Sequence, residues 1–174
     1  MSCEQGFALI LAYGIILRGC ALVEQGQGEE GIAQIRRGLV AQQATGTEGL
    51  RLYFLALLAG AYGKVEQAEE GLTILAEALT LVNKTGERFY EAELYRLRGE
   101  LTLQRFNVQG SKFNVEDSLG SSVQSLESEA EGCFLKAIEV ARRQQAKSLE
   151  LRATTSLAHL WQQQGKQAEA HQML

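Results

Sequence analysis

The chain has 174 residues, close to one average domain, and its content of 45 % apolar and 22 % charged residues is typical of a soluble protein. The formal net charge is −4 and the two signs are interspersed, so the chain lacks a basic stripe and we expect no nucleic-acid partner. Three cysteines (Cys3, Cys20 and Cys133) stand at no metal-ligand spacing and cannot all pair, which argues against a disulfide framework and indicates a cytoplasmic protein.

An apolar run, 7–17 (FALILAYGIIL), lies near the start of the chain. Glu4 precedes it in place of a basic leader, and the run is shorter than the ~20 residues that cross a bilayer. Extending the run to Val23 brings in Arg18. We therefore predict a buried core helix over 5–25 rather than a signal peptide or a membrane span, and we expect no membrane partner.

The rest of the chain is divided by glycines, since it contains no proline to break a helix. Thr47 is predicted to cap a helix, and Gly46 and Gly86 are predicted to follow helices in the C′ position. The segment 107–128 is rich in Ser and Gly and is predicted to be an inserted flexible loop. The helices predicted after the first span 28–44, 47–63, 66–84, 88–106, 127–145 and 147–164, and an incomplete one begins at 167.

One spacing of small and bulky residues recurs along the chain. In the second helix of each predicted pair, a small residue is followed four positions later by a bulky apolar residue and then, after three more, by a second small residue. The three occurrences are Gly31–Ile35–Gly38, Gly71–Leu75–Ala78 and Ala130–Phe134–Ala137. The first helices repeat as well, with small residues at Gly19, Ala59, Gly99 and Ala158. Placing these at position 8 puts the repeat starts at Ala12, Leu52, Ala92 and Leu151, at intervals of 40, 40 and 59 residues.

This pattern resembles the tetratricopeptide repeat, in which small residues let two antiparallel helices approach closely and bulky residues fill the neighbouring gaps. The resemblance implies an all-α fold: a tetratricopeptide-type α-solenoid of antiparallel helix pairs, with a period of about 40 residues and a right-handed superhelix. One domain is expected over 1–174, with repeats near 5–46, 47–86, 87–146 (with the insert 107–128) and 147–174, the last incomplete. Arg18 and Arg98 replace the leucine usual at position 7, so we expect them to snorkel, to pair with a carboxylate or to mark a shifted register.

Four stretches resemble a narrower family: 12–39, 53–79, 85–104 and 137–170. They are similar to the tetratricopeptide region at the C-terminal end of large bacterial signalling proteins. In those proteins the region follows a predicted regulatory ATPase, often beneath a class III adenylate or guanylate cyclase domain. The resemblance implies a bacterial, cytoplasmic regulatory region, and it carries over no catalytic residue because the family's catalytic groups lie in the upstream domains.

The tetratricopeptide resemblance also implies a groove lined by positions 2, 5, 9 and 12 of each first helix. The candidate partner-binding residues are Tyr13, Ile16, Tyr53, Glu93, Arg96, Glu100, Arg152 and His159. The N-terminal half of this groove is apolar and aromatic and the C-terminal half is polar, which suits an amphipathic helix or an extended peptide. The alternative is that the apolar half packs on further repeats. Of the position-5 residues only Arg96 could bind a partner's terminal carboxylate, so a carboxylate clamp is not expected.

No residue pattern indicates catalysis, a cofactor or a metal. The segment 25–31 is glycine-rich but lacks the lysine of a phosphate-binding loop, and it is better explained as a turn between helices. His159 and His171 are 12 residues apart and do not share a helix face. Glu93 and Arg96 have the spacing of an ordinary surface pair on a helix.

The sequence leaves three functions open. The first is a protein-interaction or regulatory module that binds a peptide or partner domain in the groove. The second is a self-associating scaffold, a homodimer through terminal helices, because the apolar first helix and the unfinished last pair look either cut from a longer protein or exposed for association. The third is a small-ligand sensor or enzyme, which no cluster of polar groups favours. We predict a protein that is not an enzyme.

Overall fold

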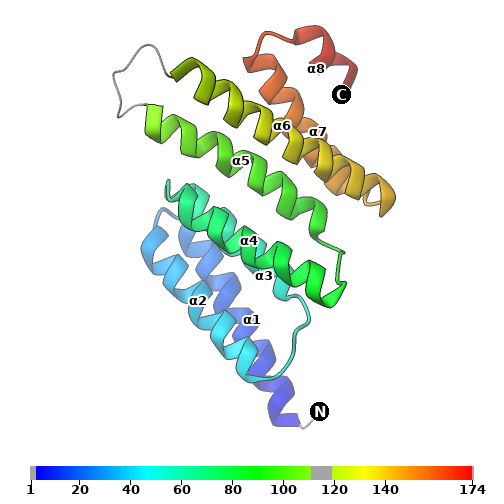
Figure 1. The fold of residues 1–174 in the computed structure, drawn as a ribbon. Helices are drawn as coiled ribbons and strands as arrows, with labels where there is room; N and C mark the ends of the chain where they lie inside the picture. Colours follow the sequence, from blue (N-terminus) through cyan, green and yellow to red (C-terminus); the bar gives the residue numbers. More distant parts are fainter. Residues whose placement is uncertain (1–2, 111–118, 174) are drawn as a thin grey trace. The chain divides into compact units, whose positions relative to one another are not determined.

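The computed structural model describes residues 3–110 and 119–173, and the side chains of 6–105 and 124–173. The described chain is all-α, with no strand among these residues, which confirms the predicted fold class (Figure 1). The helices are α1 (Cys3–Glu24), α2 (Gly28–Ala44), α3 (Arg51–Lys64), α4 (Ala68–Thr85), α5 (Glu91–Gly110), α6 (Leu119–Arg143), α7 (Lys147–Gln163) and α8 (Gln167–Met173).

Glycines follow α2 and α4 at the two positions that the sequence predicts. Gly46 (φ +70°) follows the C-cap Thr45 of α2, and Gly86 (φ +76°) directly follows α4. This left-handed conformation strains any residue with a Cβ, so glycine is the usual residue at the C′ position. Gly165 (φ +77°) has the same conformation after α7.

The predicted cap at Thr47 is wrong. Helix α3 begins at Arg51 with Leu50 at the N-cap, so Thr47 lies in the turn before it. The reason is a pair of hydrogen bonds from other helices, because Gln42 Nε2 (2.7 Å) and Tyr13 Oη (3.1 Å) both donate to the carbonyl oxygen of Gly49. These contacts hold the turn out of the helix, and they are invisible to local helix-capping signals.

The predicted loop over 107–128 is also wrong in part. Residues 107–110 end α5 and residues 119–128 begin α6, while 111–118 lie outside the described residues. Ser and Gly dominate the composition of 119–128, but Leu119, Val123, Leu126 and Ala130 recur at helical spacing. This spacing, continued by Phe134, is typical of a helix with one apolar side, and it is a better guide here than composition.

The chain divides into two compact units, Met1–Ile74 and Leu75–Leu174. The prediction of one domain over 1–174 depends on how these units are arranged relative to one another. The prediction of a right-handed superhelix depends on the same arrangement, and both stay predictions.

In the first unit, α1 and α2 form an antiparallel hairpin with glycines where the helices meet. A Cβ on Gly19 would lie 2.6 Å from the carbonyl oxygen of Gly31, and a Cβ on Gly38 would lie 2.4 Å from Cγ1 of Ile16. Helix α3 packs against both α2 and α1. Close approach at small residues is the packing that the tetratricopeptide resemblance implies, so the hairpins are of tetratricopeptide type.

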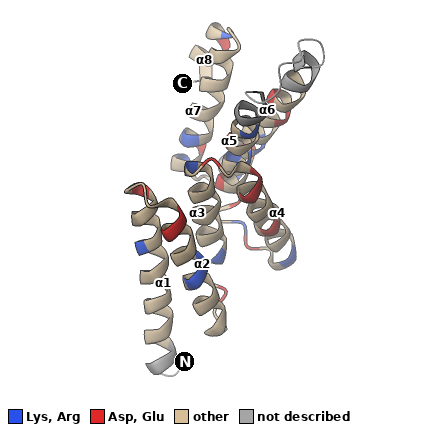
Figure 2. Ribbon diagram, turned by 90° about the vertical axis from the view of Figure 1, so that its left-hand side faces the viewer, with Lys and Arg blue, Asp and Glu red and all other residues tan. Residues whose placement is uncertain are grey.

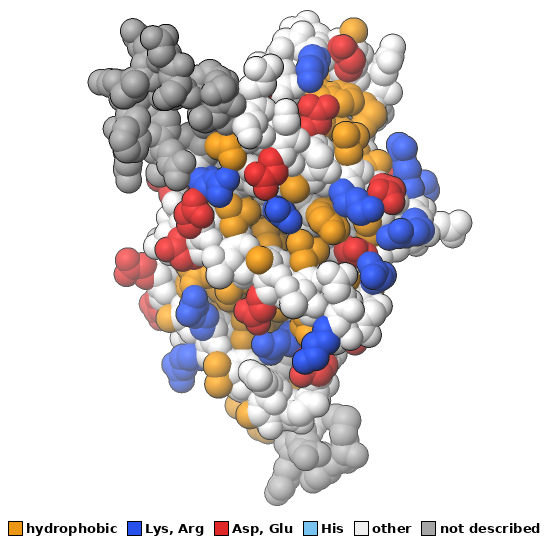
Figure 3. Space-filling model, in the orientation of Figure 1, with side chains coloured by type: hydrophobic (Ala, Val, Ile, Leu, Met, Phe, Trp, Pro, Cys, Tyr) orange, Lys and Arg blue, Asp and Glu red, His pale blue; other side chains and the backbone are white. Residues whose placement is uncertain are grey.

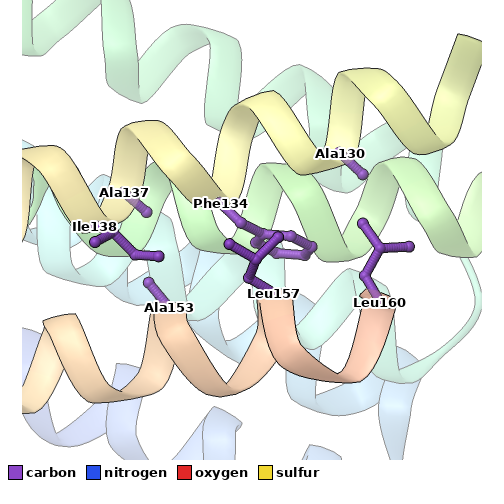
Figure 4. Packing of buried hydrophobic residues seen from close by; sticks show 7 residues of the cluster. All are labelled: Ala130, Phe134, Ala137, Ile138, Ala153, Leu157 and Leu160. Atoms are coloured by element: carbon purple, nitrogen blue, oxygen red, sulfur yellow. The ribbon is translucent and has the colours of Figure 1, made fainter. Parts of the chain in front are cut away.

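In the second unit, α6 packs against both α5 and α7, α5 and α7 also contact each other, and α8 packs on α7. Figure 4 shows the core of this unit, where Phe134 of α6 points toward Leu157 of α7. Gly99 of α5 gives the Phe134 ring its space, since a Cβ there would lie 2.5 Å from a ring carbon. The hairpin therefore repeats the first unit's rule: a glycine in one helix receives a bulky residue from the other.

Candidate functional site

The candidate residues of the first unit divide between an aromatic cluster and the core. Tyr13 of α1 and Phe54 of α3 pack with ring centroids 4.8 Å apart, and Tyr53 packs on Phe54 at 5.4 Å. Both tyrosines are half-buried. Tyr13 uses its hydroxyl to tie the Gly49 carbonyl, so its first role is to fix the turn before α3.

The prediction of Ile16 as a partner-binding residue is wrong. It has no exposed area and lies against Gly38 in the α1–α2 interface. The position usual for a groove residue therefore holds a core residue here, because the glycine opposite lets the helices close over it.

The candidate residues of the second unit lie together on α5 and α7. Glu93 and Arg96 form a bidentate pair: Arg96 Nε donates to Oε2 of Glu93 (2.9 Å), and Nη2 donates to Oε1 (2.8 Å). Side-chain exposure is only 3 % for Glu93 and 9 % for Arg96. The expectation of a surface pair is therefore wrong, because α7 packs beside α5 and covers it.

Two further charged side chains complete this group and lie farther out. Arg152 Nη2 of α7 reaches Oε1 of Glu93 at 2.7 Å, and Arg96 Nη1 also pairs with Glu100. The side chains of Arg152 and Glu100 are 51 % and 44 % exposed. Ser156 of α7 donates to Oε1 of Glu100 at 2.9 Å. We call Glu93, Arg96, Glu100, Arg152 and Ser156 the charge cluster.

The electrostatics of the charge cluster are balanced. Two carboxylates face two guanidinium groups, so the cluster carries no formal net charge. Burial by itself would lower the pKa of Arg96, but the hydrogen bond to Glu93 and the charges of Glu100 and Glu93 raise the pKa above its ordinary value. Arg96 therefore stays cationic and is already paired with Glu93 and Glu100, which explains why it is not free to bind a partner's terminal carboxylate.

His159 follows Arg152 and Ser156 along the same side of α7, at helical spacings of seven and three residues. Its side chain is exposed. The structure thus brings five of the eight candidate residues (Glu93, Arg96, Glu100, Arg152 and His159) to neighbouring α5 and α7. Ser156 was missed, although its place one turn after Arg152 on the predicted helix was a usable signal.

Other chemistry finds little support in the described side chains. Burial raises the pKa of the Cys20 and Cys133 thiols, so neither is held as the reactive thiolate. Both are free cysteines. Within the described part of the chain, no three His, Cys, Asp or Glu side chains converge as a metal site would require.

Arg98, singled out at position 7, pairs with Glu129 of α6 at 3.3 Å, while Arg18 is exposed.

Helix α1 is less buried than its apolar sequence predicts. Gly6–Glu24 is long and apolar enough to cross a membrane by length and composition alone, and only 22 % of this stretch is buried in the structure. In Figure 2 α1 is tan over most of its described length. The expectation of a buried core helix holds for one side of α1 only, where it meets α2.

Comparisons with known proteins give a fold-level likeness. No family model matches the chain, and no curated protein matches it. Among solved structures, the chain is similar to a candidate kinesin light chain from Podosopora anserina with nearly identical TPR-like repeats, and to a single-residue variant of that protein. Each match has 21 % identity and a TM-score of 0.42, and covers 92 % of this chain and 90 % of the other. Likeness this low says nothing of function, and the tetratricopeptide interpretation rests on the hairpins' own packing.

Proposed function

We propose that this chain is a protein-interaction module that binds a peptide or partner domain on the adjoining faces of α5 and α7. The observation that carries the proposal is the charge cluster, whose buried pair holds two half-exposed charged side chains in place. The same face presents the exposed His159. Helical hairpins of tetratricopeptide type generally bind proteins through such first-helix faces.

The physical advantage of this arrangement is preorganisation. A free surface arginine loses much rotamer entropy when a partner fixes it. Here Glu93 already holds one nitrogen of Arg152, and Arg96 with Ser156 already holds one oxygen of Glu100. The remaining donors of Arg152 and the second oxygen of Glu100 are left for a partner, which can receive and donate hydrogen bonds at fixed positions.

The wider context of the proposal comes from the sequence. The resemblance of 12–39 and 137–170 to the C-terminal repeats of bacterial signalling proteins supports a regulatory role beside an ATPase or cyclase. In that role, a bound partner shifts the packing of the hairpins and biases the attached output domain. The cysteine pattern of the sequence, three residues that cannot all pair, supports a cytoplasmic location. Figure 3, which draws one side of the molecule, shows charges of both signs interspersed there, and this absence of a basic stripe on the side shown supports a protein partner rather than a nucleic acid.

The experiment is partner capture from an extract of the native cell by the immobilised chain, beside an Arg152→Ala, His159→Ala variant. Both substituted side chains are exposed or half-exposed, so the fold is expected to survive. Substituting Arg96 instead would confuse lost binding with lost stability, because Arg96 is buried.

A matched control is Lys136→Ala, Leu135→Gln on α6. Leu135 is exposed, and half-exposed Lys136 pairs with the more exposed Glu139 on its own helix. We expect the α7 variant to lose the captured partner and the α6 variant to keep it. Equal capture by all three proteins refutes the α5–α7 face as the binding site.

The second candidate function is a self-associating scaffold, a homodimer with no groove ligand. The observation that favours it is the large exposed apolar area of α1, where Phe7 and Ile10 are 71 % and 69 % exposed. The molecular mass of the chain in solution tests this function, which does not involve the charge cluster.

A further inference from the structure

Helix α1 has two apolar sides, and only one of them is covered. Ala12, Ile16 and Val23 are buried, on the side that faces α2. At 3.6 residues per turn, a second group lies on the opposite side, within about 60° of Gly14. This outer stripe consists of Gly14 with Phe7, Ile10, Leu11, Leu17, Arg18 and Ala21, all exposed.

Apart from Arg18, the outer stripe is apolar over about 120°, and an apolar stripe of this width is typical of a helix side that faces other protein. Stripes wider than about 100° mark the buried side of a helix, and a helix that is apolar all round is normally enclosed. In the outer stripe Leu11 and Leu17 are 56 % and 53 % exposed, beside the still more exposed Phe7 and Ile10. The composition of α1 is therefore that of a helix packed on both sides.

Gly14 gives the outer stripe its shape. A Cβ on Gly14 would meet nothing within 4 Å. By contrast, Gly19, Gly38 and Gly99 each lie where a neighbouring helix leaves no room for a Cβ. Glycine weakens a helix interior, and in these hairpins it permits close helix approach. Gly14 likewise lacks a Cβ and could let another helix approach closely, and it lies at the centre of the uncovered outer stripe.

We propose that the outer stripe pairs with the outer stripe of a second copy of this chain, with the two α1 helices antiparallel and crossing at Gly14. The inference gives a geometry to the self-association named above, and it does not depend on partner binding at α5–α7. A two-fold interface must match itself. With Gly14 at the crossing, Phe7 of one copy lies level with Ala21 of the other, so a bulky residue meets a small one, and Leu11 lies level with Leu17.

Charge favours a second copy over a lipid surface. Helices that lie on membranes usually carry many Lys and Arg on their polar side. Among the described side chains of α1 the only basic one is Arg18, and the whole chain has a formal net charge of −4. In the antiparallel pair each Arg18 lies level with Ile10 of the other copy, so the two cations are apart and can reach solvent along their apolar stems.

The size of the outer stripe sets the strength of the pair. It runs for about 21 Å along α1, at 1.5 Å per residue from Phe7 to Ala21. Stable interfaces use roughly 20 to 30 residues a side, far more than the outer stripe offers. We therefore expect a weak dimer that dissociates on dilution between about 1 mM and about 1 μM.

The first experiment is sedimentation velocity of the 174-residue chain across that concentration range, beside Gly14→Leu and Leu17→Gln. The space around Gly14 is open, so Gly14→Leu fits the single copy and blocks only the close crossing. We expect the wild-type chain to dimerise and both variants to raise the dimer dissociation constant about tenfold or more. The matched controls Gly132→Leu and Val40→Gln, also at exposed positions, keep wild-type behaviour.

The second experiment tests the crossing itself. Gly14→Cys in a chain with Cys3, Cys20 and Cys133 replaced by serine forms a disulfide-linked dimer on mild oxidation, because only a crossing at Gly14 brings two such Cα atoms within about 7 Å. Gly132→Cys in the same background stays unlinked. A wild-type chain that is monomeric at all concentrations, or that cosediments with phosphatidylcholine vesicles as a monomer, overturns the self-association. A dimer unchanged by Gly14→Leu and unlinked by Gly14→Cys overturns the geometry alone.

Discussion

Replacing Glu93 with alanine is the sharpest test of the charge cluster. Glu93 is almost fully buried, accepts hydrogen bonds from Arg96 and pairs with Arg152. Without it, the guanidinium of Arg96 stays buried beside a single carboxylate, that of Glu100, which is itself 44 % exposed. The variant therefore leaves a buried charge that is only partly compensated.

The expected loss of stability follows from this burial. Removing one partner of a buried ion pair costs about 3–5 kcal/mol, and we place this case near 3 kcal/mol because Arg96 keeps Glu100. For a chain of this size that loss lowers the melting temperature by roughly 6–12 °C. Arg152→Ala removes a half-exposed member of the cluster instead, so it is expected to cost roughly 0.5–1 kcal/mol, as exposed ion pairs do.

Urea and thermal unfolding followed by far-ultraviolet circular dichroism measure both variants beside the wild-type chain. A third variant, Glu93→Leu with Arg96→Leu, removes both buried charges and is expected to be within about 1 kcal/mol of the wild type, since it leaves no buried charge uncompensated. If Glu93→Ala costs no more than Arg152→Ala, the pair is not buried in solution and the preorganised site is refuted.

Three further predictions concern packing and titration. Gly19→Ala is expected to lose about 1–3 kcal/mol of stability through overpacking, whereas Gly132→Ala, in open space on α6, is expected to gain up to about 1 kcal/mol; equal unfolding midpoints contradict this. Burial raises the pKa of the Cys133 thiol, so the folded state favours the neutral thiol; this stabilisation is fully present below the ordinary thiol pKa and is lost as pH rises through the raised pKa. When unfolding is measured up to about pH 10.5, the free energy of unfolding should therefore fall less at alkaline pH in Cys133→Ala than in the wild-type chain. The hydrogen bond from Lys147 lowers the pKa of Glu150, an effect present above the ordinary carboxyl pKa and lost on acidification, so NMR titration of Lys147→Met should show this pKa moving up.

Local sequence was sufficient for most helices and for the chemistry of the hairpins. The predicted helix over 28–44 is α2 as observed, and the prediction over 147–164 differs from α7 by one residue. The small residues used to find the repeat, among them Gly19 and Gly99, lie where neighbouring helices approach closely. These features are readable because helical periodicity and the absence of a Cβ act within a few residues of the chain.

The sequence predicted which residues form the candidate site but not what each of them does. The residues Glu93, Arg96, Glu100 and Arg152 were selected by their repeat positions, and the structure brings them together. The sequence could not predict which of these charged side chains are buried, because the burial of Glu93 depends on α7, more than fifty residues away in the chain. Ile16 failed as a candidate for a similar reason: the glycine that encloses it belongs to α2.

The all-α class, the pairing of helices into hairpins with small residues at the contacts, and the residue types on α5 and α7 can all be predicted from the amino-acid pattern. The buried charges, the start of α3 and the uncovered side of α1 become visible only once the helices are packed. The difference is one of range: helix propensity and side-chain size act locally, whereas the turn at Gly49, the charge cluster and the exposure of Phe7 depend on which distant helix lies opposite.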